Sequence, residues 1–155
     1  MRVIDHEDDL PEVALLVDWA WRRLEAASRR MLGVLAHIEG DSMDVDSLAR
    51  LARVRGARDA QDAIAALQRW HLVQEPMRER FAMHAVVRHA VRRRTKLSQS
   101  HVFDHYVSLL EDHPHRLMME QTHLFAAMDH AHRVSDLSGM LRIERLLQQL
   151  DESAR

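Results

Sequence analysis

The chain of 155 residues contains no cysteine, which excludes disulfide bonds, thiol catalysis and cysteine-ligated zinc. It has only four glycines, three prolines and one tyrosine, a composition typical of a helical protein with few tight turns. No apolar run approaches the roughly 18 to 20 residues that cross a bilayer, so we expect no membrane association. The N-terminus, MRVIDHEDDLPE, is acidic where a secretory signal is basic and then apolar. We therefore expect a cytoplasmic protein.

Neither sign of charge dominates the composition. The chain has 22 basic residues (Lys and Arg) and 24 acidic ones, for a formal net charge of −2, which argues against a surface that coats nucleic acid. Hydrophobic residues make up 46% and charged residues 30%, as in a globular rather than a disordered protein. The length suits one domain or two small ones.

Three amphipathic helices are predicted in the N-terminal half. Residues 11–38 form the first, because their apolar positions recur every three or four residues. Residues 45–54 form the second, and residues 60–70 form the third, with Asp59 as its N-cap and Gly56 in the preceding turn. Two helices joined by so short a turn are typical of a helix-turn-helix. The apolar face predicted for the first helix comprises Val13, Leu16, Trp19 or Ala20, Leu24, Ala27, Met31 and Leu35.

A small β-hairpin is predicted within residues 72–84. HLVQ and RFAMH are short apolar runs separated by EPMR, where Pro76 favours a turn. The next segment, AVVRHAVRRR, resumes the helical period, with Val86, Val87 and Val91 on its buried side. Helices followed by a hairpin and a further helix predict a winged-helix domain over residues 1–96.

Residues 97–155 are predicted to form a three-helix extension. The helices correspond to HVFDHYVSLLEDH, capped by Ser100 and stopped by Pro114, then RLMMEQTHLFAAMDHAHRV and DLSGMLRIERLLQQLDES. The last two form a helical hairpin of the kind found in tetratricopeptide-type arrays, where each repeat buries a face against a neighbour. We therefore expect an apolar interaction surface on this hairpin. Its candidate residues are Leu124, Met128, Leu141, Leu146 and Leu147.

Taken in order, these segments resemble the region that follows the nucleotide-binding module of STAND-class signal-transduction ATPases. LVDWAWRRLEAASRRMLGVLAHIEG is similar to that family's opening winged-helix segment, and DVDSLARLA and DAIAALQRWHLVQ are similar to its next two helices. RFAMHAVVRHAV is similar to its Met-His-Asp segment, and EQTHLFAAMDHA to the Glu-x-x-Asn-Leu-x-x-Ala-Leu pattern that opens its repeat region. The resemblance implies a regulatory arm that transmits a conformational state through protein contacts.

In that family the histidine of the Met-His-Asp segment reaches the phosphate of the bound nucleotide. The resemblance gives this cofactor-binding role to His84, but only where a nucleotide-binding module is present. Ala85 stands where the family has aspartate, and the sequence contains no G-x-x-x-x-G-K-[ST] phosphate loop. We therefore predict no cofactor for the chain by itself. The other interpretation is that His84 caps or packs at a strand-to-helix junction.

Metal binding and catalysis find little support in the sequence. Glu120 with His123 and Asp129 with His132 have the Glu-x-x-His-like spacing of di-metal bundles. However, nine residues at 100° each rotate the second pair about 180° from the first. We therefore predict no metal site. No serine lies in a Gly-x-Ser-x-Gly elbow, and we do not expect an enzyme.

DNA binding through the third helix is the alternative function, because winged helices often read the major groove in this way. The outward residues of that helix are Asp59, Gln61, Asp62, Gln68 and Arg69, and the two carboxylates would repel phosphates. The arginines that would hold a DNA backbone are Arg53, Arg55, Arg58, Arg88, Arg92, Arg93 and Arg94. The sequence therefore favours a protein partner, a neighbouring module of a longer chain or a second copy over DNA.

Overall fold

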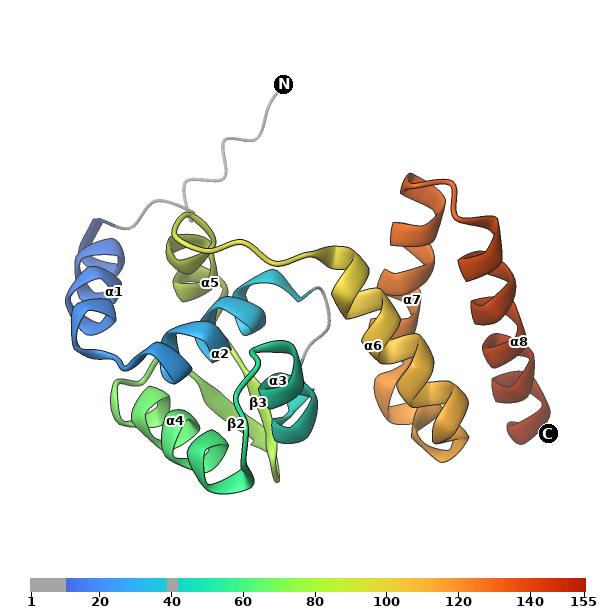
Figure 1. Ribbon diagram of the computed structural model, residues 1–155, viewed down its shortest axis with the longest axis horizontal. Helices are drawn as coiled ribbons and strands as arrows, with labels where there is room; N and C mark the ends of the chain where they lie inside the picture. The colour runs from blue at the N-terminus through green and yellow to red at the C-terminus, as the bar shows by residue number, and fades with distance from the viewer. Residues whose placement is uncertain (1–10, 39–41) are drawn as a thin grey trace. The chain divides into compact units, whose positions relative to one another are not determined.

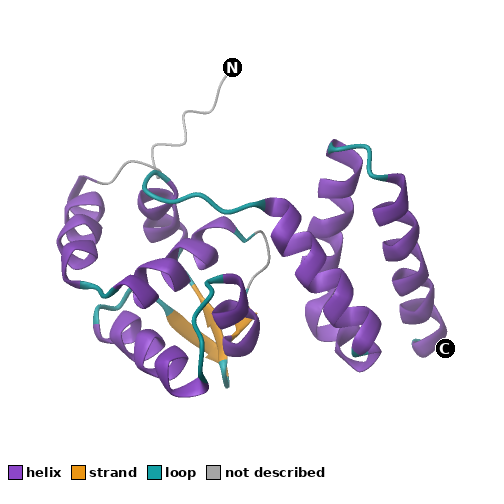
Figure 2. Ribbon diagram, in the orientation of Figure 1, coloured by secondary structure: helices purple, strands orange, loops and turns teal. Residues whose placement is uncertain are grey.

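The computed structural model describes residues 11–38 and 42–155, which are mostly helical with one small antiparallel sheet (Figures 1 and 2). They fall into two compact units. We refer to the described residues up to His37 and from Ser42 to Leu97 as the N-terminal unit, and to Ser98–Arg155 together with Ile38 as the C-terminal unit. No helix in the described ranges is long and apolar enough to cross a membrane.

The N-terminal unit contains five helices and the three strands of the sheet. The helices are α1 (Pro11–Arg23), α2 (Ala26–His37), α3 (Val45–Leu51), α4 (Ala57–Arg69) and α5 (Ala85–Arg92). The strands are β1 (Met43–Asp44), β2 (Gln74–Met77) and β3 (Arg80–Ala82), and the antiparallel sheet has the order β1-β3-β2. Helix α2 packs against α3, α4 and α5, while α1 packs against α5.

The prediction of one long helix over residues 11–38 is wrong, because the chain bends at Leu24 and Glu25 between α1 and α2. Leu16 and Trp19 are consequently exposed, and Val17 and Ala20 are the buried residues of α1. Helix α2 is buried from Met31 through Ala36, so neighbours cover it on several sides. A single apolar stripe at helical spacing does not reveal such a bend, since both helices continue the same period.

Helices α3 and α4 form near their predicted places. The residue that caps the start of α3 differs in kind from the one at the start of α4. Asp44 caps α3, and its carboxylate accepts a hydrogen bond from the backbone N–H of Ser47 at 3.1 Å. Helix α4 begins at Ala57, so the prediction that Asp59 caps it is wrong. Gly56 is its N-cap, with φ at 89°, a backbone conformation that glycine adopts without steric cost.

The predicted hairpin within residues 72–84 is confirmed as β2 and β3, but its turn is not where Pro76 suggested. Pro76 lies inside β2, and the turn is made by Arg78 and Glu79, with φ of Glu79 at 60°. Strand β2 is exposed and lies at the edge of the sheet, where the missing N–H of proline is tolerated. The third strand, β1, was not predicted, because two residues show no periodicity.

The C-terminal unit consists of three α-helices and a short 3-10 turn, and its three helices were predicted. They are α6 (Gln99–Asp112), a 3-10 turn (Pro114–Arg116), α7 (Leu117–Arg133) and α8 (Leu137–Ser153), and Ser98 rather than Ser100 is the N-cap of α6. Each α-helix packs against the other two (Figure 1). Their buried core comprises Phe103, Val107, Leu110, Leu117, Leu124, Ala127, Ala131, Ile143 and Leu146. The predicted division into a winged-helix domain, residues 1–96, and a helical extension, residues 97–155, stays a prediction.

Candidate interaction surfaces

His84 lies at the exposed start of α5, directly after β3 and the buried Met83. It is the N-cap of α5, and its Nδ1 accepts a long hydrogen bond of 3.4 Å from the backbone N–H of Val86. This contact agrees with the interpretation of His84 as a helix cap. A contact with nucleotide would need a neighbouring module, and that role stays a prediction.

The outer face of α4 is exposed as predicted, and it borders a polar pocket of about 740 Å³. This pocket lies among α4, the α1–α2 bend and the turn between α3 and α4. Its charged lining residues are Arg23, Arg30, Arg53, Arg55, Arg69, Glu25, Asp59 and Asp62. A phosphate that approached α4 from this side would therefore meet carboxylates as well as guanidinium groups.

Several arginines of the DNA-binding alternative have partners within the protein. The Nε of Arg92 donates a hydrogen bond to the backbone carbonyl of Ala36 at the end of α2. The guanidinium of Arg94 forms an ion pair with Asp18 in α1. Both side chains therefore have partners inside the N-terminal unit. Arg93 lies 3.1 Å from the Nε2 of His89, and Arg88 is half-buried.

Arg53, Arg55 and Arg58 are exposed and lie just before and in the first turn of α4. None of the three forms an ion pair with another described residue. Arg53 and Arg55 also line the polar pocket. These three arginines of the predicted DNA-binding set are therefore open to a ligand.

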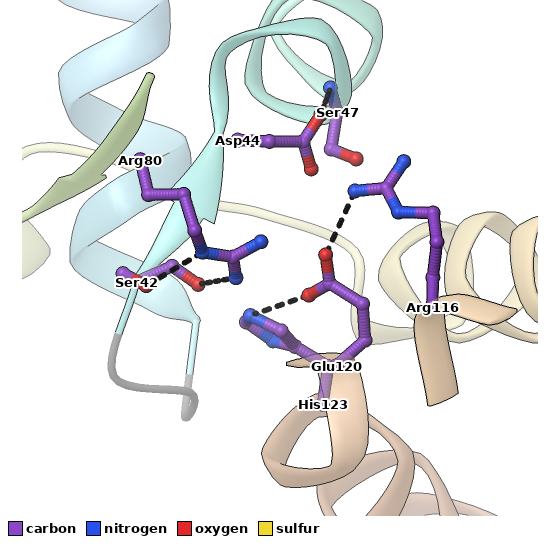
Figure 3. Close-up of polar contacts among 7 residues, drawn as sticks. All are labelled: Ser42, Asp44, Ser47, Arg80, Arg116, Glu120 and His123. Atoms are coloured by element: carbon purple, nitrogen blue, oxygen red, sulfur yellow. Dashed lines mark hydrogen bonds and ion pairs between the residues drawn. The ribbon is translucent and has the colours of Figure 1, made fainter. Parts of the chain in front are cut away.

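Arg80 is a buried arginine that the sequence pattern did not single out. Its Nε donates to the hydroxyl of Ser42 at 3.0 Å, and its Nη2 donates to the backbone carbonyl of Ser42, also at 3.0 Å (Figure 3). These bonds join β3 to the residue that precedes β1. A charged residue in a short strand next to a turn gives no sequence signal for burial.

The two carboxylate–histidine pairs of α7 lie on different sides of the helix. Glu120 and His123 are buried, whereas Asp129 and His132 are exposed. The Oε1 of Glu120 accepts a hydrogen bond of 2.8 Å from Arg116, and the other oxygen lies 3.8 Å from the Nε2 of His123 (Figure 3). Arg116 thus places a positive charge beside the Glu120 carboxylate.

A stacked aromatic contact completes this arrangement in the C-terminal unit. The ring of Tyr106 lies parallel to that of His123, with 4.1 Å between their centroids.

Within residues 11–38 and 42–155, no group of three or more histidine, aspartate or glutamate side chains is placed to hold a metal ion. That the protein binds no metal stays a prediction. Zinc titration tests it, and a stoichiometric tight site would contradict it.

The predicted interaction surface on the last two helices needs correction. Leu124 and Leu146 are only 0% and 2% exposed and belong to the core, so they do not line an open surface. The reason is that α6 packs against the face of the α7–α8 hairpin that contains Leu124 and Leu146, a face predicted from the sequence to be open. Met128 and Leu147 are partly buried against the same core, while Leu141 is 56% exposed.

A different set of apolar side chains is exposed on α7. Met118, Met119 and Phe125 are 69%, 53% and 52% exposed, and sequence reasoning missed all three as surface residues. The adjacent methionines carried a usable signal, because neighbours in a helix are rotated by about 100° and cannot both face one core.

Met118 and Phe125 border a groove of about 560 Å³ between α7 and α8, which we term the α7–α8 groove. Its lining residues are Met118, Gln121, Phe125, Glu144, Leu147, Gln148, Leu150, Asp151 and Ala154.

Comparison of the whole chain with protein-family models, with curated proteins and with solved structures finds no match.

Proposed function

We propose that this chain is a non-catalytic regulatory module that binds another protein or a neighbouring module of a longer chain. The observation that carries the proposal is the pair of large apolar side chains of α7, Met118 and Phe125, which border one groove and are each more than half exposed. Clustered exposed apolar residues mark interaction sites in water-soluble proteins. Methionine and phenylalanine are enriched at such sites, and the flexible thioether of methionine adapts to its partner.

We further propose that the N-terminal unit acts as the winged-helix arm of a STAND-type switch protein. In support, α2, α3 and α4 follow α1 and come before the β2–β3 hairpin, and α5 comes after it. The exposed position of His84 at the start of α5 leaves its imidazole accessible to a neighbouring nucleotide-binding module. The antiparallel α7–α8 hairpin supports the proposed likeness to a tetratricopeptide-type repeat.

DNA binding is the second candidate function, and the exposed Arg53, Arg55 and Arg58 favour it. They flank the start of α4, the helix that would enter the major groove. Asp59 and Asp62 lie on the same helix and would face the phosphates. Because Arg92 and Arg94 already have intramolecular partners, fewer cations remain to balance that repulsion.

Affinity for duplex DNA across a salt series, with and without nonspecific competitor, tests this choice. For a protein-interaction module we expect weak, salt-sensitive association and no preference for any sequence. Nanomolar, sequence-selective binding at physiological salt would overturn the proposal. In that case Arg53→Ala with Arg55→Ala should weaken binding and flatten the salt slope, whereas Asp59→Asn with Asp62→Asn should tighten it. Arg145→Ala, an exposed arginine of α8, is the matched control.

A further inference from the structure

We propose that the α7–α8 groove binds an amphipathic helix of a partner protein, with apolar residues on one face and lysine or arginine beside them. This inference rests on the proposed function, since it names the class of partner that the module would take. The shape, the apolar lining and the charge of the groove each contribute an argument.

The shape of the groove suits a helix. Met118, Gln121 and Phe125 of α7 are spaced i, i+3 and i+7, which puts them on one face of that helix. Glu144, Gln148 and Asp151 of α8 have the spacing i, i+4 and i+7 and form the opposite wall. A stripe of seven residues extends about 10 Å along a helix at 1.5 Å per residue. The groove is therefore long enough for about two turns of a partner helix that lies along it.

The apolar lining of the groove is continuous with the core of the C-terminal unit. Leu147 and Leu150 are partly buried and pack against that core, while Met118 and Phe125 rise from α7 into solvent. A partner that places apolar side chains at positions i, i+3 or i+4, and i+7 would remove all four from water. Such burial is the main source of affinity in a helix-in-groove complex.

Charge selects among the helices that would fit. The charged side chains that line the groove are Glu144 and Asp151, and both are acidic and exposed. Neither forms an ion pair with a described residue. A partner helix with basic flanks gains from both carboxylates, whereas an acidic helix is repelled. A second copy that presented the same groove would bring four carboxylates together, so the charge disfavours that occupant.

A panel of three fluorescent peptides tests the proposal on the full chain. Each peptide has about 16 residues, long enough to form a helix on contact, and all share one leucine face. Their flanking positions carry lysine, glutamine or glutamate. In fluorescence anisotropy we expect the basic peptide to bind at least about tenfold more tightly than the acidic one at low salt. The glutamine peptide should lie between them, and added salt should narrow the difference.

Matched variants locate the binding site. Met118→Ala and Phe125→Ala should each weaken binding of the basic peptide several-fold, because they remove apolar side chains that line the groove. Met119→Ala is the control, since Met119 is also exposed but does not line the groove. Glu144→Gln with Asp151→Asn should remove the preference for the basic peptide while leaving binding of the glutamine peptide unchanged. Circular dichroism confirms that each variant is folded.

Several outcomes would overturn the proposal. They are no saturable binding of the basic peptide, equal affinity for the basic and acidic peptides, or loss of binding in Met119→Ala but not in Met118→Ala and Phe125→Ala. Dimerisation of the wild-type chain that Phe125→Ala abolishes would assign the groove to a second copy instead. If the peptides do not bind, the proposal that the groove takes a basic amphipathic helix is wrong, but the proposed function as an interaction module is not affected. Sequence-selective DNA binding in the salt series would remove the proposed function itself.

Discussion

At the scale of single residues, close packing rather than turn geometry explains one of the helical glycines. Gly139 lies in the first turn of α8, and its backbone N–H donates to the Asp136 carboxylate at 2.9 Å. A Cβ atom at this position would lie 2.4 Å from Oδ2 of Asp136 and 2.7 Å from Cζ of Phe103. Phe103 belongs to the core and has little room to move. Backbone conformation does not explain Gly139, because the left-handed conformation, which favours glycine, is found instead at Arg53, His71 and Ser135, each just after a helix.

We expect Gly139→Ala to destabilise the C-terminal unit by about 1–3 kcal/mol, the usual cost of overpacking. The loss should occur although alanine has the higher helix propensity by about 1 kcal/mol. Urea denaturation followed by circular dichroism measures it. Ser138→Ala, an exposed neighbour in the same helical turn, should change the free energy of unfolding by less than about 0.5 kcal/mol. A stabilised Gly139→Ala variant would contradict the packing argument.

Arg92 is the residue for which sequence and structure suggest different roles. Its hydrogen bond to Ala36 satisfies a carbonyl near the end of α2, where a cation also interacts favourably with the helix dipole. We expect Arg92→Ala to lower the free energy of unfolding by about 1–2 kcal/mol. Lys96→Ala, a nearby exposed cation, is the control and should have little effect. Equal stability of the two variants would show that the Arg92 contact contributes nothing. A loss of stability in Arg92→Ala would make Arg92 a poor position for testing DNA contacts.

At the scale of elements, two hydrogen bonds link α6 to α8 at the surface of the C-terminal unit. The Nε and Nη2 of Arg142 donate to the two carboxylate oxygens of Glu111 at 2.8 and 2.7 Å. These bonds lower the pKa of Glu111, against the smaller raising effect of its burial. They likewise raise the pKa of Arg142, which therefore stays charged at every pH of interest. The ionised pair stabilises the packing of α8 on α6.

Because both side chains are more than a third exposed, we expect Glu111→Gln to cost less than about 1 kcal/mol at pH 7. The folded-state pKa of Glu111 is depressed, so its contribution is complete above the ordinary glutamate pKa. It is lost as the pH falls through the lower, folded-state pKa. Wild type and variant should therefore differ by a constant amount from pH 7 to about pH 5 and converge in acid.

Thermal or urea denaturation at a series of pH values measures this difference. Glu144→Gln is the matched control, because Glu144 is an exposed carboxylate of α8 without an ion pair among the described residues. It should not reproduce the effect of Glu111→Gln at pH 7. A gap between wild type and Glu111→Gln that widens in acid would contradict the sign of the pKa shift.

At the scale of the whole molecule, the described chain consists of two compact units, and a segment without regular structure lies between α5 and α6. The segment Thr95–Ser98 follows α5, and α6 begins at Gln99. Thr95 is held by the N-terminal unit, since the Nε2 of His37 lies 2.9 Å from both its hydroxyl and its carbonyl oxygen. Lys96 is the next residue, is exposed, and is the only lysine in the sequence.

A lysine-specific protease therefore offers a clean test of the division into domains 1–96 and 97–155. We expect cleavage of the native protein at Lys96, giving two fragments that keep their helical circular dichroism after they are separated. Mass spectrometry identifies the fragments, and Lys96→Arg should be resistant to the same protease. Fragments that unfold once they are separated would show that the two units depend on each other.

Much of the secondary structure was accessible from the sequence. The periodicity of apolar residues indicated α3, α4, α5 and the three C-terminal helices, and the paired short runs indicated the hairpin. These features are local, because a helix or a hairpin is encoded by residues a few positions apart. The carboxylates Asp59 and Asp62 of α4, which argue against DNA binding, were equally visible.

The packing partners of each helix were decided only by the tertiary structure. The bend at Leu24, the strand β1 and the burial of Arg80 depend on residues that are distant in sequence. The same holds for the interaction surface, where Leu124 proved to be core and Met118 proved to be exposed. Periodicity shows that a helix has apolar faces, but it does not show which face a neighbour covers. Here α6 covers one face of the α7–α8 hairpin, and the groove on its other side stays open.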